Sequence, residues 1–116
     1  PILLVGCSGS SRDEPGKIVE AYWQALVAKD DASLSSLSCA AFEQEALTTL
    51  ESFRVVEVVA QDVSCSSTPI DDTSASVKCS GSLVASYGAE DLVIDLSQRT
   101  YAAVKEGSEW LMCGEE

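Results

Sequence analysis

Residues 74–87, SASVKCSGSLVASY, decide the fold, because apolar or small side chains alternate along them with polar ones. This period of two is typical of a β-strand that buries one face and exposes the other to water. The exposed face carries mostly Ser and Lys. The predicted inward residues are Ala75, Val77, Cys79, Gly81, Leu83, Ala85 and Tyr87. We therefore expect a strand that packs against a covering layer.

The segments on either side of this strand share its period. Gly88-Ala89 is a suitable two-residue turn, and it would pair Ala85 with Leu92 so that apolar side chains meet. Residues near Asp72 would turn the chain between the first two strands. The other predicted strands are residues 53–65, 91–104 and 109–113. Together these segments predict a four-stranded antiparallel meander sheet.

Before residue 53 the apolar period is helical. Pro15 suits the first turn of a helix, and Val19, Tyr22 and Leu26 then follow at helical spacing. The three predicted helices are residues 15–29, 30–37 and 40–51. The predicted fold class is thus α+β, with three N-terminal helices packed on a four-stranded antiparallel meander sheet.

The first seven residues resemble the end of a bacterial lipoprotein signal. Leu4-Val5-Gly6-Cys7 is similar to a lipobox, and the apolar run before it is too short to span a membrane. We expect a lipid on Cys7, a basic segment upstream of Pro1, and a linker that continues to residue 13. A short buried strand ending in Gly-Cys is the alternative. If the lipobox prediction holds, residues 14–116 form one extracytoplasmic domain.

Four cysteines follow Cys7, an even number in a compartment expected to be oxidising. Three pairings are possible, and the register of the sheet favours one of them. A hairpin centred near Asp72 sets Cys65 opposite Cys79 on the inward face. Cys113 is expected to turn inward in the last strand, towards the helical layer that holds Cys39. We therefore predict the disulfides Cys65–Cys79 and Cys39–Cys113.

The chain is strongly acidic, with a net charge of -12. Such a surface repels nucleic acids and anionic lipid headgroups, so we expect neither as a partner. Membrane attachment would therefore depend on the lipid at Cys7. The chain has no histidine, no C-x-x-C pair, no phosphate-binding loop and no calcium-loop pattern, so we expect no metal or cofactor.

Three stretches resemble the nuclear-transport-factor-like, cystatin-like cone fold, and in particular small secreted bacterial lipoprotein domains. The first is residues 18–26, IVEAYWQAL, followed by Asp30. The second is residues 36–39, SLSC, and the third is residues 101–110, YAAVKEGSEW, where a Gly turn precedes Trp. The resemblance covers residues 15 to 113 and implies helices that close one face of a curled sheet. This chain departs from the family pattern in that it has no first hairpin between the predicted helices.

The resemblance also raises the question of catalysis, because this fold class includes enzymes like ketosteroid isomerase. The predicted register turns Glu57 inward opposite Tyr87, with Gln61 on the same face. A carboxylate beside a phenol in a partly apolar pocket is a plausible acid–base pair. Tyr22 and Trp23 would line this ligand pocket from the first helix. The alternative is that Glu57 lies at a wet cone mouth and Tyr87 caps the core.

The other face of the predicted sheet is unusually apolar. A patch of this kind is often a partner surface, and proteins of this fold frequently dimerise through that face. A shift of one residue in the last hairpin would instead turn Trp110 into the core. The predicted partner face comprises Val56, Val58, Val93, Tyr101, Trp110 and Met112. A homodimer through this face is the favoured prediction.

These observations favour a lipid-anchored, non-catalytic extracytoplasmic domain that binds a small apolar ligand or an envelope protein. The alternative is a ketosteroid-isomerase-like or dehydratase-like enzyme that uses Glu57 and Tyr87. A cone filled by Trp23, Phe42 and Phe53 would favour the binding domain. The sequence leaves the ligand and the choice between inner and outer membrane open.

Overall fold

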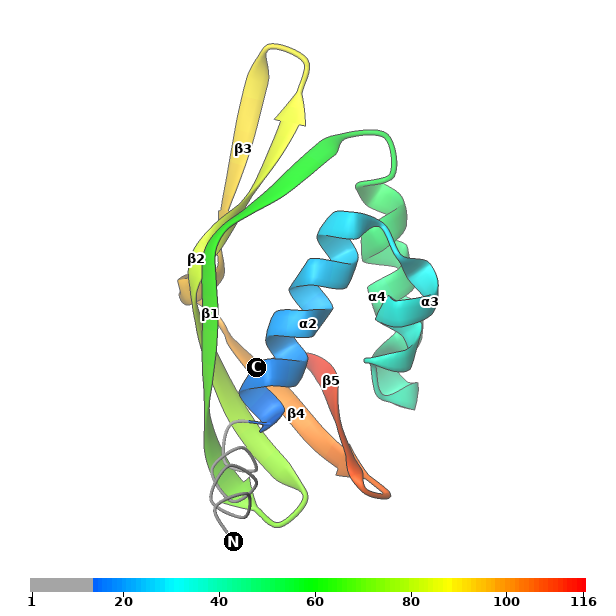
Figure 1. Ribbon diagram of the computed structural model, residues 1–116, viewed down its shortest axis with the longest axis vertical. Coiled ribbons are helices and arrows are strands. Elements are labelled where there is room, and N and C mark those ends of the chain that lie inside the picture. The colour runs from blue at the N-terminus through cyan, green and yellow to red at the C-terminus, as the bar shows by residue number, and fades with distance from the viewer. Residues whose placement is uncertain (1–13) are drawn as a thin grey trace, which may run out of the picture.

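The computed structural model describes residues 14–116, in which three helices pack against a curled antiparallel sheet (Figure 1). The helices are α2 (Glu14–Ala28), α3 (Asp31–Ser36) and α4 (Ala40–Ser52). The strands are β1 (Glu57–Asp71), β2 (Ser74–Tyr87), β3 (Glu90–Asp95), β4 (Thr100–Glu106) and β5 (Glu109–Glu115), with a 3₁₀ turn η1 (Leu96–Gln98) between β3 and β4. The α+β prediction is confirmed. The predicted lipobox, with Cys7, lies outside the described residues.

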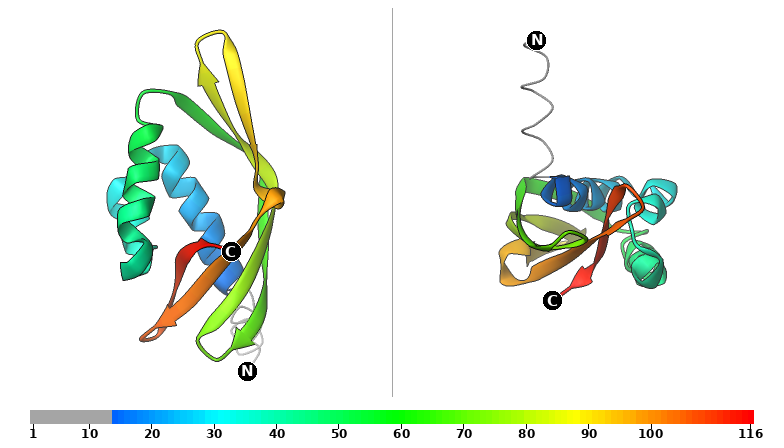
Figure 2. Two further views of the ribbon diagram at one scale, coloured as in Figure 1. Left: turned by 180° about the vertical axis from the view of Figure 1, so that it is seen from behind. Right: turned by 90° about the horizontal axis from the view of Figure 1, so that it is seen from below.

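The sheet is organised around the long strand β2. Strand β1 runs along one side of β2, while β3 and β4 share its other side. The upper residues of β2, 82–87, pair with β3, and the lower residues, 74–78, pair with β4, which in turn pairs with β5. The predicted third strand is therefore two strands. The helices lie on the concave side of the sheet, and the β2–β3 hairpin extends past them (Figure 2).

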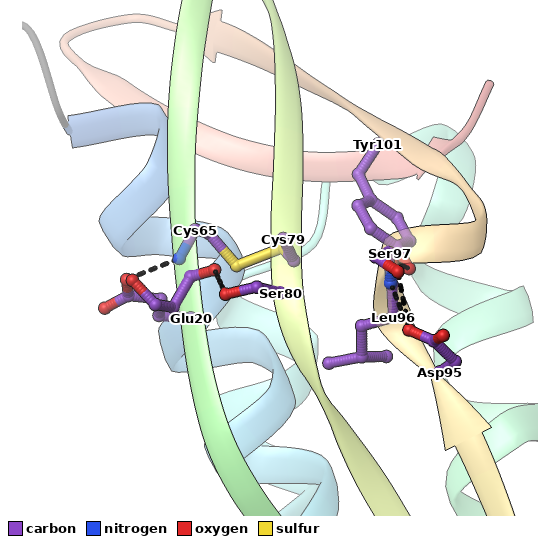
Figure 3. Close-up of a disulfide and its surroundings, with 9 residues drawn as sticks. Glu20, Cys65, Cys79, Ser80, Asp95, Leu96, Ser97 and Tyr101 are labelled. Carbon is purple, nitrogen blue, oxygen red and sulfur yellow. Dashed lines mark hydrogen bonds between the residues drawn. A yellow bond between two sulfur atoms is a disulfide. The ribbon is translucent and has the colours of Figure 1, made fainter.

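Helix α2 forms the centre of the core. Its buried residues Val19, Tyr22, Trp23 and Leu26 recur at the three- and four-residue spacing that places them on one side of a helix. The helix also contacts the edge of β1, where Glu20 Oε2 accepts a hydrogen bond of 2.7 Å from the backbone N–H of Cys65 (Figure 3). This carboxylate satisfies an edge amide that would otherwise face outward.

Both predicted disulfides are present. Cys65–Cys79 joins directly opposite positions of β1 and β2, with the Cα atoms 4.0 Å apart. Cys39–Cys113 joins the start of α4 to β5. Beside it, Met112 donates to the Leu37 carbonyl and Cys39 donates to the Met112 carbonyl, both at 2.8 Å. The short segment between α3 and α4 thus covers the outer edge of β5.

A bulge in β1 changes the register of the sheet. Below it, Cys65 pairs with Cys79 as predicted, but Asp62 and Val63 together stand opposite the single residue Gly81. Asp62 and Gly81 have φ angles of 55° and 90°. A Cβ at Gly81 would approach the Asp62 carbonyl oxygen to 2.4 Å, so glycine is required for this close approach.

The bulge reverses which face each residue of upper β1 presents. Val58 pairs with buried Ala85 and lies in the core, so its predicted place on the outer face is wrong. Glu57 pairs with Ser86 and is exposed, and Gln61 is exposed as well. Their predicted inward orientation is wrong for the same reason: one extra residue exchanges the two faces of a strand.

The 3₁₀ turn η1 causes a second shift of one residue. After it, Tyr101 of β4 pairs with Val77 on the inward face of β2. Its hydroxyl donates a 2.8 Å hydrogen bond to the Leu96 carbonyl within the turn (Figure 3). Ala103 also faces inward, and its partner Met112 is buried with it. The predicted outward orientation of Tyr101 and Met112 is therefore wrong.

Two disulfides indicate an oxidising, extracytoplasmic environment. Over residues 14–116, no helix is both long enough and apolar enough to cross a membrane.

Candidate functional site

The interior of the cone is largely filled by aromatic side chains. Trp23, Phe42 and Phe53 are each less than one tenth exposed. They leave a cavity of about 200 Å³ between α2, α4 and the sheet. Its apolar walls come from Trp23, Leu26, Phe53, Leu96 and Tyr101, and its mouth is bordered by Thr49, Asp95, Arg99 and Glu115.

One polar atom of Trp23, a residue that lines this cavity, stands out. The indole Nε1 of Trp23 is buried, and it has no hydrogen-bond partner among residues 14–116. The indole packs edge-on against Tyr22 and Tyr101, with ring centroids 5.1 Å and 5.3 Å away. Leaving a buried donor without an acceptor costs roughly 1–3 kcal/mol. An acceptor atom on a bound molecule would remove that penalty.

The charged groups at the cavity mouth are already engaged. Arg99 Nη1 and Glu115 Oε1 form an ion pair of 3.0 Å. Asp95 accepts hydrogen bonds from the Ser97 hydroxyl at 2.7 Å and the Ser97 backbone N–H at 3.0 Å (Figure 3). The hydroxyl, followed by the backbone bond, lowers the pKa of Asp95 below its ordinary value. Asp95 is therefore ionised and holds the 3₁₀ turn in place.

Two buried phenols pack against the Trp23 indole, and one of them, Tyr101, lines the cavity. Burial, with the charge of Glu115 as a smaller cause, raises the pKa of Tyr101 to about 12. Burial also raises the pKa of Tyr22, helped by the charges of Glu115 and Glu45. Both phenols stay protonated at neutral pH, so they are hydrogen-bond donors and poor bases.

The structure brings only part of the predicted pocket together. Tyr22 and Trp23 lie in the core as predicted. Glu57 is exposed on the outer face, and Tyr87 is 46% exposed beside the turn on the other face, next to buried Ala85 on its strand. The predicted acid–base pair of Glu57 and Tyr87 is therefore wrong, because the bulge places the two side chains on opposite faces.

The cavity residues from the third predicted strand were missed. Asp95, Arg99 and Tyr101 reach the cavity because η1 interrupts the strand between them. A signal for this interruption exists in the sequence. Asp95 precedes Ser97 by two residues, a spacing at which an Asp side chain can bond the backbone and form a local turn.

The predicted partner face does not form one patch. Val58, Tyr101 and Met112 lie in the core. Val56 and Trp110 are half-buried, and Trp110 borders a groove of about 480 Å³ beside the start of α2. Val93 is exposed on the β2–β3 hairpin, at the other end of the molecule (Figure 1). Homodimerisation itself stays a prediction.

Comparisons with known proteins identify the fold. No family model and no curated protein sequence matches the chain. A candidate scytalone dehydratase from Novosphingobium aromaticivorans DSM 12444 aligns with a TM-score of 0.57 at 16% identity, over 83% of this chain and 74% of that one. A candidate dehydratase of the NTF2-like family from Streptomyces avermitilis also gives a TM-score of 0.57, at 12% identity over 85% and 88% of the two chains. The chain has the NTF2-like fold.

Proposed function

We propose that this chain is a non-catalytic extracytoplasmic binding domain, anchored by a lipid on Cys7, that holds a small apolar ligand in the cone. The observation that carries the proposal is that Trp23, which lines an apolar cavity, has a buried indole Nε1 with no hydrogen-bond partner among residues 14–116. A ligand with one carbonyl acceptor satisfies this donor while its apolar body contacts Phe53 and Leu96.

The size of the cavity limits the ligand. Its volume of about 200 Å³ lies below the ~300–1,000 Å³ that is usual for drug-sized ligands. Engineered apolar cavities of ~150 Å³ bind benzene. The ligand class is therefore a monocyclic aromatic, or a compound of similar bulk, with a single acceptor.

A matched pair of probes tests this proposal. Acetophenone has a carbonyl acceptor, while ethylbenzene has nearly the same shape without one. We expect acetophenone to bind about fivefold more tightly, as one additional hydrogen bond provides. In ¹⁵N NMR spectra, it should shift the indole N–H resonance of Trp23 downfield and leave that of Trp110 in place.

The variant Trp23→Phe identifies the resonance and removes the donor. It should bind both probes equally. A preference for acetophenone that survives Trp23→Phe, or an unchanged indole resonance in the wild-type protein, would contradict the proposal.

The lipid anchor requires its own test. Intact mass spectrometry of protein expressed with its full leader should show a diacylglyceryl mass increase that Cys7→Ala removes. If Cys7 stays unmodified in bacterial cells that lipidate other lipoproteins, the anchor is contradicted, while the ligand proposal is unaffected.

A dehydratase is the second candidate, because both structural neighbours are described as candidate dehydratases. Here the acid–base groups would have to come from the cavity mouth, where Glu115 lies near Tyr101. Scytalone is the probe that the Novosphingobium neighbour suggests. Turnover of scytalone that Glu115→Gln abolishes would replace the binding proposal, whereas we expect no turnover.

A further inference from the structure

Strand β3 has an open edge. Among residues 14–116 it pairs only with β2. By contrast, the β1 edge is covered by α2 at Cys65, and the β5 edge is covered by the segment before α4 at Met112. The β2–β3 hairpin extends beyond the helices in Figure 1 and in the left view of Figure 2. Unpaired strand edges are templates for another strand.

The open edge presents backbone groups in a regular order. Tyr87 and Glu90 flank the two-residue turn and face each other, so they form the hydrogen-bonded pair that closes the hairpin. In an antiparallel ladder, hydrogen-bonded and non-bonded pairs alternate. The N–H and C=O groups of Asp91 and Val93 therefore point away from β2, towards solvent.

Apolar side chains surround this edge. On the outer face, Val59, Val84 and Val93 form one row across three strands. Val59 and Val93 at its ends are 51% and 60% exposed. On the inner face, Leu92 is 50% exposed beside half-buried Ile94. A strand added here would bury apolar surface on both faces.

Carboxylates border this apolar row on both sides. Above it, Glu57 and Asp91 lie in the same cross-strand row through Ser86, whose hydroxyl donates to Asp91 at 3.0 Å. Below it lies Asp95. Cationic side chains placed next to Asp91 and Asp95 would meet opposite charge, whereas anionic ones would be repelled.

We propose that the edge of β3 binds an extended, cationic peptide segment of another protein by strand addition. The segment has a basic residue, three apolar residues and a second basic residue. In antiparallel pairing, the basic residues stand beside Asp91 and Asp95, and the central residue exchanges two backbone hydrogen bonds with Val93. This surface is separate from the Trp23 indole, so the inference does not depend on the proposed ligand.

A second copy of this chain does not fit the edge. Pairing two β3 strands symmetrically about Val93 places Asp91 of one copy opposite Asp95 of the other, which is repulsive. Each copy also carries a net charge of -12. No two of the 7 basic residues are four positions apart, so the chain does not contain the matching pattern.

A labelled peptide tests the proposal on the folded, disulfide-bonded protein. The probe is fluorescein-Gly-Ser-Lys-Val-Ile-Val-Lys-Ser-Gly, and binding is followed by fluorescence anisotropy. The same peptide with Glu in place of both Lys residues should not bind. Methylating the backbone nitrogen of the central Ile should weaken binding at least about tenfold, because it removes a main-chain hydrogen bond and adds bulk at the edge.

Variants of the protein provide the complementary test. Val93→Pro removes the edge N–H without touching the bonds to β2, a position where proline is tolerated. It should reduce affinity at least about tenfold, while the matched Val93→Ala should change it less than about threefold. Asp91→Asn with Asp95→Asn keeps both local hydrogen-bond acceptors and should weaken binding about fivefold, with a shallower salt dependence.

Three results would overturn the proposal. Equal binding of the Lys and Glu peptides would remove the charge argument. Unchanged affinity for the N-methyl peptide would show that main-chain pairing is not used, even if Val93→Pro failed to fold. A concentration-dependent dimer in sedimentation that Val93→Pro abolishes would assign the edge to a second copy.

Discussion

The lower and upper halves of the molecule are built on the same strand, yet one is closed and the other open. Below Gly81, β2 has β1 and β4 beside it, and its inward residues Ala75 and Val77 are fully buried. Above Gly81, the inward residues Leu83 and Ala85 are buried as well, but the strand ends in the exposed Tyr87, and Leu92 beside it on β3 is also exposed. A period of two therefore shows which residues share a face. It does not show whether another layer covers that face.

The largest effect is expected from removing the Cys39–Cys113 disulfide in the closed, lower half. Replacing both Cys39 and Cys113 by Ala opens a loop with a sequence separation of 74. In the chain-entropy model, we expect the free energy of unfolding to fall by about 4 kcal/mol. Urea unfolding measures it, and the matched comparison is replacement of both Cys65 and Cys79 by Ala, which opens a loop with a sequence separation of only 14 and should cost less. A loss below about 1 kcal/mol would show that packing alone closes the lower half.

The next test concerns the boundary between the halves. Gly81→Ala should cost about 3 kcal/mol, because its φ of 90° is unfavourable and the new Cβ meets the Asp62 carbonyl oxygen at 2.4 Å. Gly88→Ala is the matched control, with a φ of 66° and nothing within 4 Å of the new Cβ. It should cost about 1 kcal/mol. Equal losses in thermal unfolding would contradict the bulge.

A third test compares the same substitution in the two halves. Val77→Ala removes fully buried methyl groups and should cost about 2 kcal/mol. Val93→Ala acts on a side chain that is 60% exposed and should change stability by less than about 0.5 kcal/mol. Urea midpoints for the two variants measure this directly. Similar losses would mean that the upper half is covered in solution.

The smallest expected effect is a dependence on acid at the join between β3 and β4. The hydrogen bonds from Ser97 lower the pKa of Asp95 in the folded protein. The stabilisation they provide is therefore present above the unfolded-state pKa near 4, and it is lost as the pH falls through the folded-state pKa. Asp95→Asn should flatten the dependence of stability on pH in this acid range. An unchanged profile would contradict the role of Asp95 in the turn.

The sequence predicted the elements and the disulfides well, since each depends on local pattern. The start of a second helix at Asp30-Asp31, the helical period of α2 and the opposition of Cys65 and Cys79 all appear in the structure. The candidate site was predicted less well. Tyr22 and Trp23 lie in the core and Trp23 lines the cavity, but Glu57 and Tyr87 were wrongly placed together on one face.

The errors have one physical cause. Each of two single-residue insertions exchanges the faces of the strand on one side of it: the bulge that of upper β1 before it, and η1 that of β4 after it. On both sides of an insertion the alternation looks regular, so periodicity alone cannot reveal it. A glycine within an alternating strand and an Asp two positions before Ser are the local signs that mark the two places.

The Cys65–Cys79 bond has a consequence for how the sheet can rearrange. A bulge can migrate along an antiparallel ladder as neighbouring residues exchange partners. Each step changes the pairing register of the residues that the bulge has passed. A covalent link between directly opposed residues is a barrier that no such defect can cross. The β1–β2 register below Cys65 is thus fixed whatever happens above it. Any shift of register stays confined to the stretch between the start of β1 and Cys65.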